Sequence, residues 1–125
     1  MPLARCTPVT FLFTRDREKA KAFYRDVLGL THTGADEYAE EFDLNGVPLR
    51  IVPIADHTPS PHTILGWDVS DVSATVAAMK AKGVAFQIYE GFGQTADGIW
   101  EAPDGRTKIA WFLDPDGNNL SISQD

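Results

Sequence analysis

The chain is poor in the residues that would tie it to several common partners. It has one cysteine, Cys6, in 125 residues, so it can form neither an internal disulfide nor a thiolate metal cluster. It has 11 Lys and Arg residues against 18 Asp and Glu, a formal net charge of −7, and its basic residues do not cluster. Binding to a nucleic-acid backbone depends on grouped Lys and Arg side chains, so no nucleic-acid partner is expected.

Long apolar runs are also missing. No stretch approaches the roughly 20 apolar residues that cross a bilayer, and residues 1–6 lack the apolar core of a signal peptide. We therefore expect no membrane partner and a cytoplasmic location. With 43% hydrophobic residues, the chain can build one compact domain over residues 1–125 with a single core.

What is present is a strong strand pair at the end of the chain. Residues 108–113 are mostly apolar, residues 114–118 read Asp-Pro-Asp-Gly-Asn, and residues 119–124 alternate polar with aliphatic side chains. Proline and glycine in the middle segment favour a tight turn. The pattern predicts a β-hairpin.

The first half of the chain predicts a strand, a helix and three further strands. Residues 9–14 form a short apolar run, and Asp16 is a good helix N-cap. Apolar residues then recur at helical spacing as far as Gly29. Asn45-Gly46 is a strong signal for a two-residue turn between strands. The three strands are expected at 30–34, 37–44 and 47–53.

The same order repeats after a Pro-rich linker at 54–61. A second N-cap, Asp71, lies 55 positions after Asp16 (71 − 16), and its helix should end at Gly83. Strands are expected at 64–70, 84–90 and 108–123, with a long Gly-rich loop at 91–107. The duplication predicts an α+β fold of two βαβββ modules, about 7–54 and 62–124, within one domain.

Three stretches, Thr14-Arg15-Asp16 to Leu28-Gly29-Leu30, residues 67–84 and residues 111–118, occur in the order typical of one family. With them the chain resembles the vicinal oxygen chelate superfamily, which includes glyoxalase I, extradiol dioxygenases, and fosfomycin and bleomycin resistance proteins. The resemblance covers nearly the whole chain. It implies that each module curls its strands into a half-open barrel around a cavity, and that two chains form a homodimer. A shared fold does not determine function.

The resemblance also implies four equivalent cavity positions at which metal-dependent members carry metal ligands. In this sequence they fall on Val9, Arg50, Ile64 and Ser121. A divalent metal needs carboxylate or imidazole ligands, and Arg is a fixed cation that repels it. The three histidines, His32, His57 and His62, have no evident carboxylate partner. We expect no metal and no other cofactor.

Strand alternation predicts which side chains face the cavity. They are Val9, Phe11, Phe13, Ile64, Asp68 and Ser121. Such a wall suits an amphipathic organic ligand, although Phe11 and Phe13 are equally consistent with side chains that only fill space. Trp100, in the predicted loop at 91–107, is either a lid that stacks on the ligand or a packing residue.

Arg50 is the residue that most needs a partner. The two-residue turn places Glu41 directly across from it on the same face. In one interpretation the two form a buried structural salt bridge where relatives hold metal. In the other, Arg50 keeps donors free for an anionic or carbonyl group of a ligand.

Two functions follow from this pattern. The first is a metal-independent protein that binds a small organic molecule, as a bleomycin-resistance protein does, and sequesters an antibiotic or an amphipathic metabolite. The alternative is an enzyme of the same fold, a glyoxalase-like lyase or isomerase or a dioxygenase-like protein, with unusual active-site residues. The sequence offers no signal for a catalytic nucleophile.

Overall fold

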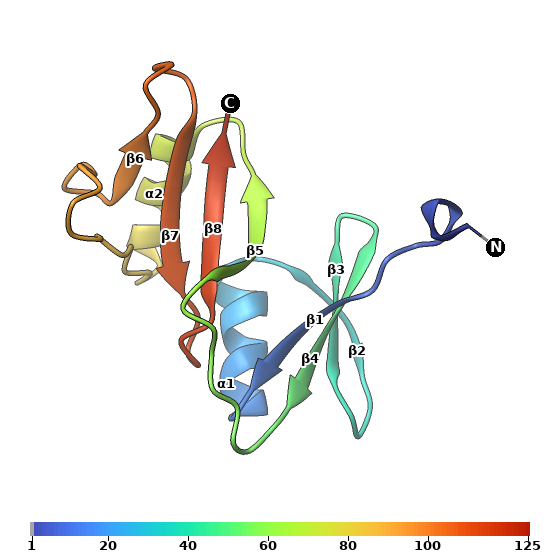
Figure 1. The fold of residues 1–125 in the computed structure, drawn as a ribbon. Coiled ribbons are helices and arrows are strands. Elements are labelled where there is room, and N and C mark those ends of the chain that lie inside the picture. Colours follow the sequence, from blue (N-terminus) through green and yellow to red (C-terminus); the bar gives the residue numbers. More distant parts are fainter. Residues whose placement is uncertain (1) are drawn as a thin grey trace. The chain divides into compact units, whose positions relative to one another are not determined.

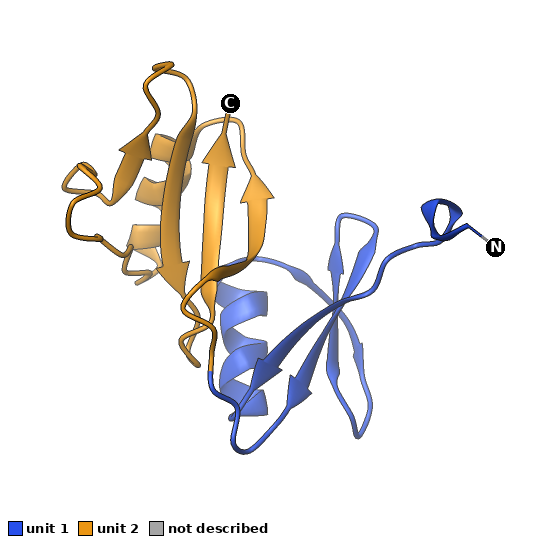
Figure 2. Ribbon diagram, viewed as in Figure 1, with its two compact units in different colours: residues 1–58 blue, residues 59–125 orange. Residues whose placement is uncertain are grey.

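A computed structural model describes residues 2–125 (Figure 1). The chain divides into two compact units, residues 1–58 and residues 59–125 (Figure 2). Each unit contains its own four-stranded sheet and its own helix.

The first unit begins with a short 3₁₀ turn and continues as strand, helix and three strands. Its elements are η1 (Leu3–Arg5), β1 (Thr10–Thr14), α1 (Arg17–Ala22), the π-helical turn η2 (Phe23–Val27), β2 (Thr31–Ala35), β3 (Glu40–Leu44) and β4 (Val47–Pro53). The sheet order is β1-β4-β3-β2, with β1 and β4 parallel. As predicted, Asp16 caps the helix, and its side chain accepts a hydrogen bond from Lys19 N (3.2 Å).

The second unit repeats this arrangement. Its elements are β5 (Thr63–Asp68), α2 (Val72–Ala81), β6 (Ile99–Glu101), β7 (Lys108–Leu113) and β8 (Asn119–Gln124), in the sheet order β5-β8-β7-β6. Asp71 caps α2 and accepts a hydrogen bond from Ala74 N (3.0 Å). The predicted α+β fold with two βαβββ modules is confirmed.

The predicted strand at 84–90 is wrong. Only Phe86 makes a β-bridge in this segment, to Phe112, and the third strand of the unit is β6, inside the predicted loop. The reason is the side-chain amide of Gln94. It accepts from Tyr89 N (2.7 Å) and donates to the carbonyls of Gln87 and Gly98 (2.9 and 2.7 Å). Backbone N–H and C=O groups that could pair with a neighbouring strand are thus hydrogen-bonded to a side chain instead.

Each sheet buries one face and exposes large apolar side chains on the other. The buried residues include Leu12, Tyr24, Phe42, Leu49 and Ile51 in the first unit and Val72, Val76, Phe112, Leu120 and Ile122 in the second. Phe11 and Phe13 flank Leu12 in β1 and are exposed. The strands therefore alternate as predicted, and we call the side that carries Phe11 the open face of the first sheet. None of the helices formed by residues 2–125 is long and apolar enough to cross a bilayer.

Candidate functional site

The candidate site is built around Arg50, in the interior strand β4. Backbone pairing places Phe11, Arg50, Glu41 and Gly34 in one row across the four strands. Residues directly opposite one another point to the same face, and Phe11 is 54% exposed, so this row lies on the open face. The prediction that Glu41 lies across from Arg50 is confirmed.

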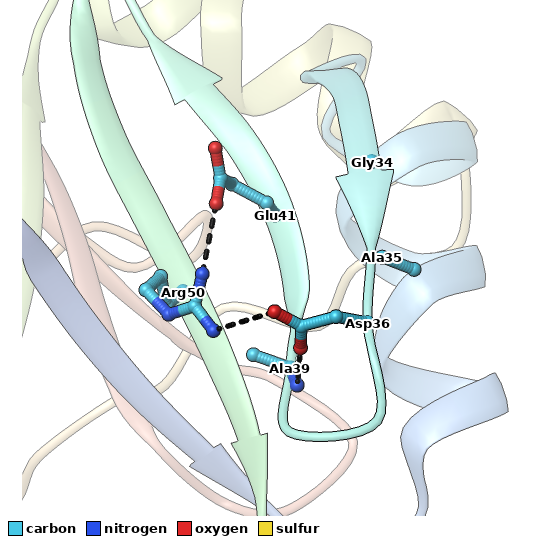
Figure 3. Close-up of a pocket in the computed structure, with 6 residues that line it drawn as sticks. All are labelled: Gly34, Ala35, Asp36, Ala39, Glu41 and Arg50. Carbon is cyan, nitrogen blue, oxygen red and sulfur yellow. Dashed lines mark hydrogen bonds and ion pairs between the residues drawn. The ribbon is translucent and has the colours of Figure 1, made fainter.

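Two carboxylates converge on the Arg50 guanidinium (Figure 3). Its Nη1 donates to Glu41 Oε2 (2.9 Å), and its Nη2 donates to Asp36 Oδ2 (3.3 Å). Glu41 comes from β3 and Asp36 from the connection between β2 and β3. Arg50, Glu41 and Asp36 line a small pocket of about 140 Å³, and the other lining residues are Gly34, Ala35 and Ala39.

Asp36 is a member of the site that the sequence pattern did not reveal. Its Oδ1 accepts hydrogen bonds from Tyr38 N (2.8 Å) and Ala39 N (2.9 Å). These bonds, first from Tyr38 and then from Ala39, lower the pKa of the Asp36 carboxyl below its ordinary value of 3.8, and Arg50 lowers it further. Asp36 is therefore ionised at neutral pH. With Glu41 and Arg50 it gives the site a net negative charge.

The Arg50–Glu41 pair is not the buried salt bridge of the first interpretation. The side chains of Arg50, Glu41 and Asp36 are 27%, 41% and 52% exposed, because they stand on the open face. Pairs of this kind contribute only about 0–1 kcal/mol to stability. A guanidinium has five N–H donors. Within residues 2–125, the Arg50 guanidinium donates hydrogen bonds to Glu41 and Asp36 only. Arg50 therefore retains donors that a ligand could use.

The other predicted residues divide between the two units. Val9, directly before β1, and Phe13 are exposed like Phe11, and Phe13 packs beside His57 with ring centroids 5.8 Å apart. Ile64 and Asp68 lie in β5 and Ser121 in β8, all in the second unit. The structure thus brings Phe11, Glu41 and Arg50 together in one row. Val9 and Phe13 lie outside this row but at the same strand, β1, whereas Ile64, Asp68, Trp100 and Ser121 belong to the other sheet.

Trp100 does not lie in a loop, which corrects the prediction of a mobile lid. It is the central residue of β6, pairs with Ile109 of β7 and is half-buried. A side chain whose backbone is held in a ladder cannot swing with a loop. A contribution of Trp100 to a ligand contact remains a prediction.

His32 is not isolated, contrary to expectation. Its Nε2 lies 2.8 Å from Glu40 Oε1, and Glu40 also accepts from Arg17 Nε. Burial raises the pKa of the Glu40 carboxyl, but hydrogen bonds from Arg17 and His32 and the charge of Arg17 lower it more, so the pKa lies below the ordinary 4.5. This cluster occupies the buried face, on the side opposite Arg50. Within the described residues, no three His, Cys, Asp or Glu side chains form a group that could hold a metal ion.

The row in the second unit that corresponds to the Arg50 row carries different chemistry. Gly66 pairs with Ser121, which pairs with Trp111, just as Phe11 pairs with Arg50 and Arg50 with Glu41. Gly66 lies close to its neighbour, since a Cβ there would be 2.6 Å from Ser121 Oγ and the hydroxyl would have to move.

Comparison with known proteins places this architecture in a family. Residues 4–122 match the model of the Glyoxalase/Bleomycin resistance protein/Dioxygenase superfamily. The chain belongs to this superfamily. A comparison with curated proteins yields no match.

Solved structures of the superfamily fold share the architecture at low sequence identity. Lactoylglutathione lyase from Agrobacterium tumefaciens is 18% identical, with a TM-score of 0.72 over 96% of this chain and 93% of that one. The fosfomycin resistance protein FosX from Listeria monocytogenes is 14% identical, with a TM-score of 0.75 over 94% and 91%. A glyoxalase/bleomycin resistance protein/dioxygenase from Alicyclobacillus acidocaldarius is 17% identical, with a TM-score of 0.72 over 99% and 94%. At these identities the likeness shows the fold alone.

The metal site implied by the superfamily does not fit this chain. Its four positions carry two hydrocarbon side chains, one hydroxyl and one guanidinium: Val9, Ile64, Ser121 and Arg50. The nearest carboxylates to that guanidinium, Glu41 and Asp36, are already bonded to it. A divalent cation would have to bind beside Arg50 and compete with it for both carboxylates.

Proposed function

We propose that this protein binds a small organic molecule at the Arg50 site and does so without a metal. The observation that carries the proposal is the guanidinium on the open face, fixed by two carboxylates yet with donors to spare. An exposed aromatic side chain, Phe11, stands next to it in the row and can receive an apolar part of the ligand.

The charges of the site narrow the class of ligand. Two carboxylates around one guanidinium repel a simple anion, and the whole chain carries a net charge of −7. A molecule with a positively charged amine, a carbonyl oxygen and an apolar group matches the arrangement better. The amine faces Glu41 and Asp36, the carbonyl accepts from Arg50, and the apolar group covers Phe11.

A matched pair of probes tests this proposal. Phenylalaninamide carries a positively charged amine, a carbonyl and a ring, whereas in N-acetylphenylalanine the amine is blocked by acetylation and a negatively charged carboxylate replaces the amide. In an NMR titration of the ¹⁵N-labelled protein, we expect the first to shift backbone resonances around Phe11, Glu41 and Arg50, and the second to leave them unchanged. Arg50→Met should abolish the shifts without unfolding the protein. Tighter binding of the anion, or unchanged binding by Arg50→Met, would contradict the proposal.

Metal independence has its own test. The protein is dialysed against zinc, nickel, manganese and iron(II) salts in turn, freed of excess ion, and analysed for bound metal. We expect less than stoichiometric metal in each case and the same phenylalaninamide affinity before and after. Tight, stoichiometric binding of one ion would favour the alternative, an enzyme of this superfamily with an unusual ligand set.

We also propose that two chains pair. Large apolar side chains exposed on each sheet, among them Phe13 in the first unit and Ile64 in the second, support an association, because burial of apolar surface stabilises it. Light scattering should give about twice the chain mass, and a mass near 13.7 kDa would contradict pairing.

A further inference from the structure

The second unit contains a pocket of about 240 Å³ that is separate from the Arg50 site in the sequence and in its sheet. Its lining is mainly aromatic and, among residues 2–125, includes no Lys, Arg, Asp or Glu. The lining residues are Pro61, His62, Thr63, Tyr89, Phe92, Trp111 and Asn119.

Three aromatic rings form the core of this pocket. Trp111 stands in the interior strand β7, and its ring is nearly perpendicular to those of Tyr89 (76°) and Phe92 (78°). The ring centroids of the three side chains are 5.7 to 6.0 Å apart. We call these three residues the aromatic triad. Its rings lie at steep angles to one another, so no single flat molecule can stack on all of them.

Two amide side chains hold Tyr89, one member of the triad, in place. Asn119 donates to the Tyr89 hydroxyl (2.9 Å) and to Pro61 O (3.4 Å), and it accepts from the Thr63 hydroxyl (3.0 Å). Gln94 binds Tyr89 N and also the carbonyls of Gln87 and Gly98. The pocket is therefore organised before any ligand arrives, which lowers the entropic cost of binding.

The triad is also accessible. Phe92 is 52% exposed, and Tyr89 and Trp111 are only half-buried. The triad therefore leaves apolar ring surface at the wall of a pocket that opens to solvent.

We propose that the aromatic triad binds a quaternary ammonium group. A compact cation with methyl groups on every side can touch several rings at once, and each ring attracts it through its π-system. Among the described residues, the pocket lining has no carboxylate. This disfavours a primary ammonium group, whose N–H donors need strong acceptors. A quaternary ammonium group has no N–H and does not need them. The net charge of −7 adds a general attraction for cations.

Choline and its neutral isostere, 3,3-dimethylbutan-1-ol, provide the test. The three indole N–H resonances of Trp67, Trp100 and Trp111 are followed during titration of the ¹⁵N-labelled protein, and Trp111→Phe assigns the relevant one. We expect choline to shift the Trp111 resonance and the isostere to bind at least about fivefold more weakly.

Two variants locate the site. Phe92→Leu keeps an apolar side chain but removes one ring, and it should weaken choline binding by about threefold or more. Ile88→Ala is the matched control, because Ile88 is an exposed apolar residue of the same segment outside the pocket lining, and it should leave the affinity unchanged. Equal binding of choline and the isostere, no effect of Phe92→Leu, or tighter binding of flat indole than of choline would each overturn the proposal.

Discussion

Replacing Glu40 by Gln should destabilise the protein far more than the same change at its neighbour Glu41. The Glu40 side chain is 4% exposed and bonded to Arg17 and His32. Glu41 bonds to Arg50 on the open face and remains 41% exposed. The two residues are adjacent in one strand and point to opposite faces, so the pair of variants compares a buried with an exposed carboxylate in almost the same backbone environment.

The loss of unfolding free energy depends on which groups each substitution leaves without an ionic partner. Breaking a buried ion pair from one side costs about 3–5 kcal/mol. Arg17 retains backbone acceptors, the carbonyls of Asp36 and Ala39, and its side chain is 25% exposed, which reduces the cost. We therefore expect Glu40→Gln to lower the free energy of unfolding by about 2–3 kcal/mol. Glu41→Gln should cost less than about 1 kcal/mol.

The difference between wild type and Glu40→Gln should depend on pH. Since the pKa of Glu40 is lower in the folded protein than its ordinary 4.5, the unfolded chain takes up this proton first as the pH falls. The stability that the charge contributes is fully present above about pH 5 and decreases as the pH falls below 4.5 towards the folded pKa. The variant lacks the titrating group, so the two unfolding free energies should converge in acid.

Urea unfolding provides the assay, followed by far-UV circular dichroism and by tryptophan fluorescence. All three tryptophans, Trp67, Trp100 and Trp111, lie in residues 59–125, so fluorescence reports on the second unit and circular dichroism on both. Coincident transitions would show that the units unfold together and would justify a two-state free energy. Equal losses for the two variants, or a difference between wild type and Glu40→Gln that does not shrink as the pH falls below 4.5, would refute the reasoning.

Three glycines yield further predictions. In chemical unfolding, Gly98→Ala should lower the free energy of unfolding by about 2–4 kcal/mol, because its φ is +89° and a Cβ would lie 3.0 Å from Phe86 Cβ. Gly91→Ala has a similar φ of +86° but open space around the new Cβ, so it should cost only about 1–2 kcal/mol. Equal costs would show that the contact with Phe86 does not matter. Gly66→Ala should cost about 1–3 kcal/mol, and Ser121→Ala in the same chain should recover part of it by removing the hydroxyl oxygen 2.6 Å from the new Cβ. Failure of Ser121→Ala to recover any stability would assign the cost to another contact.

The features that the sequence predicts well are those determined locally. Asp16 and Asp71 cap helices because the cap involves only the next three residues. The turn at Asn45-Gly46 defines the register of two strands, and Glu41 must then face Arg50. A duplicated pattern of such local signals was enough to predict the fold.

The missed features depend on side chains that reach across the structure. Asp36 meets Arg50 from a different strand connection, and no spacing rule links the two positions. The β2–β3 register shifts between His32 and Gly34, so the contact of His32 with Glu40 could not be derived from regular pairing. The strand predicted at 84–90 fails for a more local reason, because the Gln94 side chain, a few residues along the same segment, hydrogen-bonds the backbone of Gln87 and Tyr89.

The paired rows of the two sheets have a consequence for how this chain could change over time. Phe11, Arg50 and Glu41 in one unit correspond to Gly66, Ser121 and Trp111 in the other, on backbones with the same register. The first row holds an aromatic side chain beside two charged ones, and the second holds a glycine, a hydroxyl and an indole ring. The same strand pattern therefore carries a different chemistry in each sheet, and neither row depends on the residues of the other. The same independence offers protein engineers two separate surfaces on which to install new recognition, because side chains on one row can be exchanged without redesigning the other.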